Sequence, residues 1–170
     1  MEKSNVVLIG MPTSGKSTVG VIAAKILGMD FVDTDIVIQQ REGARLCEII
    51  EERGVDGFME CEKQALLSLD VKNTVIATGG SAVYSKEAME HLKRSSKVAY
   101  LKVEKEELFK RLKEVKERGV VLRNGETVED MYYERVKLYE EFADLTIPEE
   151  NATIEDTVRG LIAGLRKGGR

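Results

Sequence analysis

Short apolar runs alternate with longer amphipathic segments along almost the whole chain. Each run is rich in Val, Ile, Leu or Phe and is short enough to be a strand inside a sheet. The predicted strands cover residues 6–9, 31–32, 74–77, 98–103 and 145–147. Between them, apolar residues recur every three or four positions, which predicts helices with one buried face. Because strands and helices alternate, we expect an α/β protein in which a five-stranded parallel sheet lies between two layers of helices.

The predicted helices differ in how clearly their ends are marked. The first begins near Gly15 and ends at Gly28, a residue typical of a helix C-terminus. The others cover residues 36–50 with a break near Gly43, 58–69 after a turn at 54–57, 86–93, 104–117, 128–142 and 154–165. The polar stretch 118–127 contains a glycine and predicts a loop with the character of a flap.

The loop between the first strand and the first helix has a phosphate-binding pattern. Residues 10–17 read GMPTSGKS, with two glycines five positions apart followed by Lys and Ser, in the strand-then-helix context that the P-loop requires. Gly10 and Gly15 permit positive φ, so that backbone N–H groups can turn toward a triphosphate, and a side chain at Gly15 would block its approach. The helix N-terminus and the full charge of Lys16 both attract the β- and γ-phosphates.

The remaining residues of this loop complete a nucleotide site. The Ser17 hydroxyl is a hard oxygen ligand suited to Mg²⁺, which is usually shared with substrate phosphates. Further nucleotide contacts are expected from Thr13, Ser14 and Thr18. The alternative, a plain glycine turn with a solvated Lys16, is disfavoured because the whole pattern follows an apolar strand.

Two more strands are followed by residues suited to a site. Asp33 and Asp35 come after the second strand, and Gly79 and Gly80 come after the third. Because sites in open α/β sheets form at the carboxyl ends of the strands, we expect these residues to gather beside the P-loop. Their alternative roles are a helix-capping pair for the aspartates and a simple turn for the glycines.

Composition narrows the class of ligand. The 170 residues suit one domain, and 42% hydrophobic and 33% charged residues are ordinary for a globular protein. The net charge of −4 and the mixing of basic with acidic residues argue against nucleic acid and favour a small phosphorylated molecule. Cys47 and Cys61 have the spacing of neither a zinc site nor a disulfide framework. No segment reads as a signal peptide or membrane span, so we expect a cytoplasmic protein, and a monomer by default.

Five motifs in order resemble the shikimate kinase family: GMPTSGKSTVG, FVDTD, FMECE, TGG and ERVKLYEEFADL, spanning roughly residues 6–145. The resemblance implies a P-loop NTPase fold of the nucleoside monophosphate kinase-like kind, as a three-layer α/β/α sandwich. It implies ATP-dependent, Mg²⁺-assisted phosphorylation of a hydroxyl group on a small molecule, as in shikimate to shikimate 3-phosphate. Residues 1–170 would form a single kinase domain, with a substrate-binding helical segment at about 36–62 and a lid at about 116–127.

The resemblance also implies roles for individual residues. Lys16 would neutralise the phosphates, Ser17 and Asp33 would hold Mg²⁺, and Asp35 would bind the acceptor hydroxyl and act as its base. Backbone N–H groups of Gly79 and Gly80 would contact the acceptor. The three expected arginines are Arg135 on an acceptor carboxylate, Arg118 from the lid on the transferred phosphoryl group, and Arg111 stacked on adenine. The alternative role of Arg135 is to pair with Glu134, Glu140 or Glu141 on a solvated helix face.

The sequence departs from the family pattern where the acceptor is expected. The family's F-R-x-x-E segment has Met59 in place of the arginine, and a charged hydrogen bond of that kind is worth roughly 1.5–3 kcal/mol. Either shikimate binds weakly, helped by Arg41 or Arg45, or the acceptor is another polyol or hydroxy acid with an apolar patch facing Met59. We favour the second interpretation slightly, because Ser81 also replaces a glycine of the family's G-G-G.

The lid departs from the pattern as well. The family's R-P-L-L motif corresponds to residues 118–121, RGVV, and loss of the proline gives a freer loop. Arg123 is therefore a second candidate for the lid arginine. These departures leave two other functions open: a nucleotide-binding regulatory protein that has lost catalysis, and a nucleoside or other small-molecule kinase of similar fold.

Overall fold

The computed structural model describes residues 3–114 and 121–167. Five strands form one sheet: β1 (Asn5–Gly10), β2 (Asp30–Asp33), β3 (Thr74–Ala77), β4 (Ser96–Lys102) and β5 (Leu145–Pro148). The helices are α1 (Lys16–Leu27), α2 (Thr34–Glu42), α3 (Leu46–Leu67), α4 (Lys86–Ser95), α5 (Lys105–Glu114), α6 (Val128–Phe142) and α7 (Ile154–Lys167), with a short 3₁₀ turn η1 (Ala82–Tyr84).

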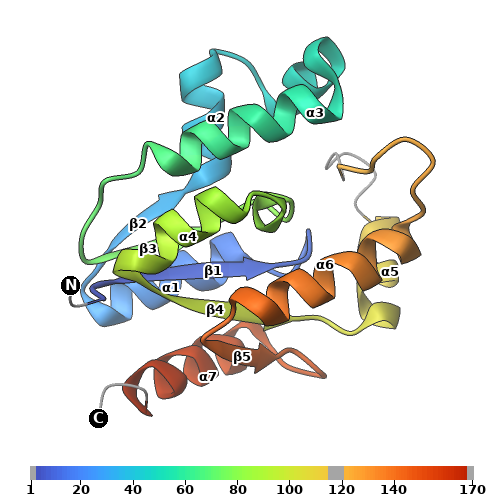
Figure 1. Cartoon of the computed structure of the whole chain (residues 1–170). Coiled ribbons are helices and arrows are strands. Elements are labelled where there is room, and N and C mark those ends of the chain that lie inside the picture. The colour runs from blue at the N-terminus through green and yellow to red at the C-terminus, as the bar shows by residue number, and fades with distance from the viewer. Residues whose placement is uncertain (1–2, 115–120, 168–170) are drawn as a thin grey trace.

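All paired strands are parallel, in the order β2-β3-β1-β4-β5 (Figure 1). Successive side chains of β1 point to opposite faces of the sheet, as a strand requires. Val7 and Ile9 join a core with residues of α4, α5 and α6, whereas Val6 and Leu8 join a core with residues of α1 and α7. The predicted three-layer α/β/α sandwich is therefore confirmed. The carboxyl ends of β1, β2 and β3 lead into the P-loop, Asp33–Asp35 and Gly79–Gly80 respectively.

Helices α2 and α3 enclose a third, smaller core, which includes Ile38, Ile49 and Phe58. The predicted break at Gly43 is present, since Gly43 ends α2 with φ of 66°. The predicted turn at 54–57 is narrower in the structure: within α3 only Gly54 leaves helical geometry, with φ of 70° and ψ of −178°, and two helical segments meet there at a kink. A glycine can adopt this positive φ without the strain that a side chain would cause, and it separates the two helical segments of α3.

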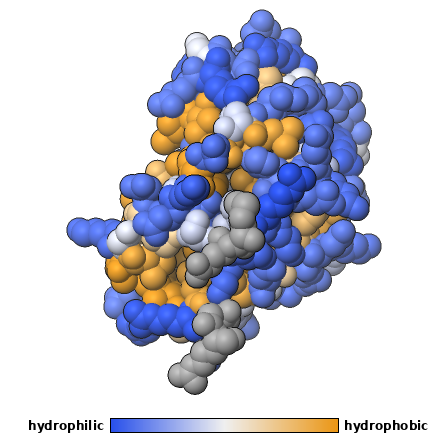
Figure 2. Space-filling model, turned by 60° about the vertical axis from the view of Figure 1, so that its left-hand side comes forward, coloured by the Kyte–Doolittle hydropathy of each residue, from blue (hydrophilic) through white to orange (hydrophobic). Residues whose placement is uncertain are grey.

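On the face that Figure 2 shows, hydrophilic side chains predominate and apolar side chains gather in patches. Within residues 3–114 and 121–167, no helix combines the length and the apolar character needed to cross a membrane. The predicted flap lies partly outside the described residues, as does the end of the predicted helix 104–117. Residues 121–127, the described part of the flap, form no helix or strand before α6 begins.

Candidate functional site

The P-loop has the backbone conformation that its glycines predict. Gly10 has φ of 153°, and Gly15, which caps the N-terminus of α1, has φ of 77°. A Cβ at position 10 would lie 2.6 Å from the Leu101 carbonyl oxygen, so close packing also excludes a side chain there. At Gly15 the only neighbour of such a Cβ is Val19 at 4.0 Å, so positive φ, rather than contact with the protein, selects glycine. Thr13 also has positive φ, 68°.

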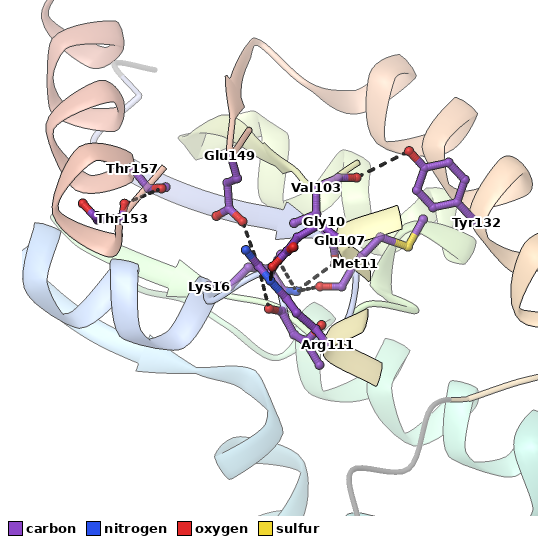
Figure 3. Close-up of polar contacts among 12 residues, drawn as sticks. Gly10, Met11, Lys16, Val103, Glu107, Arg111, Tyr132, Glu149, Thr153 and Thr157 are labelled. Atoms are coloured by element: carbon purple, nitrogen blue, oxygen red, sulfur yellow. Dashed lines mark hydrogen bonds and ion pairs between the residues drawn. The ribbon is translucent and has the colours of Figure 1, made fainter. Parts of the chain in front are cut away.

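The Lys16 side chain folds back over this loop. Its ammonium group donates to the carbonyl oxygens of Gly10 at 2.8 Å and Met11 at 2.7 Å, and to Ser14 Oγ at 3.2 Å (Figure 3). Lys16 is only 7% exposed, and burial lowers the pKa of its ammonium group to about 8, against the opposing attraction of Asp35 and Glu149. The loop therefore holds a desolvated cation where phosphate oxygens are expected.

Ser17 and Asp33 meet beside the loop. The Ser17 hydroxyl donates to Asp33 Oδ2 at 2.5 Å, and Asp33 Oδ1 accepts from the backbone N–H of Asp35 at 3.0 Å. Asp33 is therefore also the N-cap of α2, so the capping role considered from sequence is real and coexists with its place in the site. A hydroxyl and a carboxylate oxygen side by side are chemically suited to Mg²⁺, which prefers oxygen ligands and keeps water and phosphate in its other positions.

One cavity of about 560 Å³ connects the P-loop with the predicted acceptor residues. Its lining includes Lys16, Asp35 and Arg135, which come from α1, α2 and α6. Other predicted residues along it are Thr13, Gly15, Ser17, Thr18, Asp33, Gly79 and Gly80. Gly10 and Ser14 are not part of this lining. The structure thus brings together residues that are more than one hundred positions apart in the sequence.

The two glycines after β3 are selected by close contact. A Cβ on Gly79 would lie 2.5 Å from Glu62 Oε1 and 3.2 Å from Asp35 Oδ1. A Cβ on Gly80 would lie 2.9 Å from Pro12 Cδ and 3.0 Å from Arg135 Nη1. Side chains at these positions would fill the space between the acidic residues, the P-loop and the guanidinium group. The backbone can therefore approach a ligand at this point.

Arg135 is a buried cation without a carboxylate partner. It is 1% exposed, and no ion pair within 4.0 Å involves it in the described part of the chain. Its guanidinium group donates to the Val121 carbonyl at 2.5 Å and to the Tyr84 hydroxyl at 3.3 Å, and lies 5.2 Å from the centre of the Tyr84 ring. The solvated ion pair considered from sequence is therefore wrong for Arg135.

Arg111 links α5 to the nucleotide side of the site. Its Nη1 donates to the Thr13 carbonyl at 3.1 Å and pairs with Glu149 at 3.2 Å, while Nε pairs with Glu107 at 2.8 Å (Figure 3). Sequence reasoning missed Glu149, which is 7% exposed and has its pKa raised by burial. It directly follows β5, so its place at the carboxyl edge of the sheet was the signal available.

Comparison with known proteins agrees with this geometry. The family model described as shikimate kinase matches residues 12–166. The chain is 40% identical over 160 residues to a shikimate kinase of Haemophilus influenzae, covering 90% of this chain and 88% of that protein. It is 43% identical over 141 residues to a shikimate kinase of Clostridium botulinum, covering 80% and 82%. The chain belongs to the shikimate kinase family. It is therefore an ATP-dependent kinase that phosphorylates a small molecule.

The fold is that of solved shikimate kinases. The structure of shikimate kinase from Acinetobacter baumannii in complex with shikimate matches with a TM-score of 0.87 and 30% identity, covering 98% of this chain and 94% of that one. The prediction of family, fold class and enzyme type is confirmed.

The departure from the family pattern at Met59 has a structural counterpart. Met59 lines a second hollow of about 400 Å³ beside the main cavity, and it does not line the main cavity. Glu62 and Ser81 border both hollows, and the Ser81 hydroxyl donates to Glu62 Oε2 at 2.5 Å. Met59 therefore borders the hollow next to the main cavity and not the main cavity itself. Neither the Glu62–Ser81 contact nor the second hollow was predicted from sequence.

The other basic residues considered from sequence occupy different places. Arg45 lines the main cavity, where it pairs with Glu48 at 2.9 Å, whereas Arg41 lies on the exposed surface of α2 outside that lining. Arg123 pairs with Glu134 at 3.0 Å and lies 4.3 Å from the centre of the Tyr84 ring. Arg118 lies outside the described residues.

Proposed function

We propose that this chain transfers the terminal phosphoryl group of ATP to a hydroxyl group of shikimate, with Mg²⁺ bound beside the phosphates. The observation that carries the proposal is that Lys16, Asp35 and Arg135 line one cavity. Among the two acceptors considered from sequence, the curated relatives and the shikimate-bound structure of similar fold favour shikimate. Arg45, in the lining of the same cavity, is available to supplement Arg135 in place of the cation absent at position 59.

The phosphate half of the site binds and neutralises charge. The first N–H groups of α1 have no acceptor within the helix and point toward the loop. Lys16 exchanges its contacts with loop carbonyls for phosphate oxygens, and Ser17 and Asp33 hold Mg²⁺. When bound, this ion screens the charge that develops on the phosphates during transfer. Arg111, fixed by Glu107 and Glu149, borders the nucleotide beside Thr13.

The acceptor half orients the attacking hydroxyl. Asp35 accepts a hydrogen bond from that hydroxyl and takes its proton as the new P–O bond forms. Backbone N–H groups of Gly79 and Gly80 bind the acceptor where side chains are excluded. Arg135 binds the acceptor carboxylate through its planar guanidinium group, which can engage both oxygens at once. Because phosphoryl transfer depends mainly on alignment and charge neutralisation, these contacts account for catalysis.

Two segments would complete the kinase domain of residues 1–170. Residues 36–62, in α2 and the first part of α3, form the wall of the acceptor cavity that carries Gln39, Arg45 and Ile50. Residues 116–127 would act as the lid, with the lid cation supplied by Arg118 or Arg123. The contact from Arg135 to the Val121 carbonyl joins the described end of this segment to the acceptor site.

The test is release of ADP with a panel of acceptors that includes shikimate, quinate, gluconate and nucleosides. We expect shikimate to be turned over, and Asp35→Asn to abolish turnover while ATP binding persists. Asp30→Asn, at the opposite end of β2, is the matched control and should keep full activity. ATP binding without turnover of any acceptor would refute the proposal and favour a regulatory protein. Selective turnover of nucleosides would favour the other kinase class.

A further inference from the structure

Glu62 is a buried carboxyl group with a single hydrogen-bond partner among the described residues. It is 2% exposed, its Oε2 accepts from the Ser81 hydroxyl, and its Oε1 has no partner within the described part of the chain. No Lys, Arg or His nitrogen lies within 4.0 Å of it in residues 3–114 and 121–167. A fully ionised carboxylate at such a site carries a large desolvation cost that one hydroxyl cannot offset.

The position of Glu62 makes its charge important to the acceptor. A Cβ on Gly79 would touch Glu62 Oε1 on one side and Asp35 Oδ1 on the other, so the two carboxyl groups flank the Gly79 backbone. Glu62 also lines the cavity that holds Arg135. An acceptor with a carboxylate would bring a further negative charge into this cavity, beside both acidic residues.

The surroundings of Glu62 determine its protonation. Met59, one turn earlier on α3, contributes no charge. Burial raises the pKa of Glu62 to about 7, the Ser81 hydrogen bond opposes this rise, and the nearby charge of Asp35 adds to it. In the described part of the chain, the titratable and charged groups on the elements around it are Lys16 on α1, Asp35 on α2, Tyr84 on η1, Lys86 and Glu87 on α4, and Arg135 and Tyr139 on α6.

We propose that Glu62 carries a proton whenever an anionic acceptor is bound, so that acceptor binding is coupled to uptake of one proton by this carboxyl group. The proton comes from solvent and resides on the Glu62 carboxyl, while the acceptor carboxylate stays ionised against Arg135. Glu62 is then a positioning residue that acts through its charge. The inference rests on the proposed function, because shikimate supplies the anion.

The direct test is calorimetric titration of the full chain with shikimate at pH 7.5, in two buffers that differ in ionisation enthalpy. With a pKa of about 7, Glu62 is about three-quarters ionised in the free enzyme at this pH, so about 0.7 proton should be taken up on binding. Glu62→Gln keeps the size and cannot titrate, so it should bind shikimate with no such uptake. Uptake below about 0.1 proton in the wild type, or equal uptake in Glu62→Gln, would overturn the proposal.

Two further variants shift the pH dependence of the KM for shikimate in opposite directions, and they test the proposal even if Glu62→Gln does not fold. The wild-type KM for shikimate should rise about 15- to 25-fold between pH 6.5 and 8.5, as Glu62 ionises in the free enzyme. Ser81→Ala removes the hydrogen bond that stabilises the carboxylate, so the rise should begin at higher pH. Met59→Arg places a cation one turn from Glu62, which lowers the pKa of Glu62. The KM for shikimate should then no longer rise between pH 6.5 and 8.5. A rise unchanged in both variants would contradict the assignment to Glu62.

The methyl ester of shikimate separates charge from shape. Because it is neutral, its KM should lack the rise that Glu62 causes. An equal rise for the ester would overturn the coupling. The two proposals fail in different ways: if shikimate is neither bound nor phosphorylated at any pH, the proposed function fails and this inference fails with it. If shikimate is phosphorylated with no proton uptake, only the inference fails.

Discussion

Arg135 offers a sharp test of the acceptor site, because it is buried and makes no ion pair within 4.0 Å in the described part of the chain. Burying a cation away from water costs free energy, so binding of an anion beside it is favoured. The informative change is Arg135→Lys, which keeps the positive charge and removes the planar fork. It also leaves the Val121 carbonyl and the Tyr84 hydroxyl without the donors they have now.

The magnitude follows from the number of hydrogen bonds lost. The guanidinium group of Arg135 can donate to both oxygens of the shikimate carboxylate. The lysine side chain is shorter, so its ammonium group keeps only one such hydrogen bond. Losing one charged hydrogen bond costs about 1.5–3 kcal/mol, which lowers kcat/KM for shikimate about 10- to 150-fold. Because Asp35 and the P-loop are untouched, we expect most of this change in the KM for shikimate and none in the KM for ATP.

The assay is ADP release with shikimate varied at saturating ATP, followed by ATP varied at saturating shikimate. Arg159→Lys is the matched control: Arg159 lies on α7, its side chain is 70% exposed, and its pairing with Glu155 contributes little. A KM for shikimate that changes less than about threefold in a folded Arg135→Lys variant would refute the reasoning. The carboxylate would then be bound elsewhere, and Arg45→Ala would be the next variant to measure.

Three further predictions concern packing and charge around the two halves of the site. Gly79→Ala should lower the free energy of unfolding, measured in urea, by about 1–3 kcal/mol, because the alanine Cβ would lie 2.5 Å from Glu62 Oε1. An unchanged urea concentration at the midpoint of unfolding would contradict this close contact. Burial lowers the pKa of Lys16 to about 8, so ATP binding by the wild type should weaken above pH 8, where Lys16 loses its charge. ATP binding by Lys16→Met should show no such pH dependence. Glu149→Gln removes a charge that raises the pKa of Lys16, so ATP binding should begin to weaken at a lower pH than in the wild type. Titration with a fluorescent ATP analogue at a series of pH values measures this. If ATP binding weakens at the same pH as in the wild type, Glu149 acts only on Arg111.

The phosphate half of the site was predictable because it is contiguous. Gly10, Gly15, Lys16 and Ser17 lie within one loop, and their chemistry depends on backbone conformation and on the start of one helix. The alternation of strands and helices then placed Asp35 and the glycines after β3 at the same edge of the sheet. The local sequence pattern and the geometry of parallel sheets were sufficient to predict the phosphate half of the site and the five-stranded fold.

The turn predicted at residues 54–57 was right in place but too long. Two nearby glycines indicate a loop, and Gly54 does break helical geometry, whereas Gly57 keeps it. Ile49, before the kink, and Phe58, after it, both pack into the small core with α2. Tertiary contacts of this kind favour a helix at Gly57 despite the weak helix propensity of glycine, and they are invisible in a single stretch of sequence.

The acceptor half could be predicted only in part, because its side chains come from separate elements and depend on one another. From sequence, Met59 and Ser81 are two unrelated departures from the family pattern. In the structure they act on the same residue: without a cation at position 59, the buried Glu62 retains one hydrogen bond, and Ser81 supplies it. A glycine at position 81 would leave both oxygens of Glu62 without a partner, at a cost of about 1–3 kcal/mol. The two positions should therefore change together, so a glycine at 81 is best tolerated in this chain when Met59 is replaced by arginine.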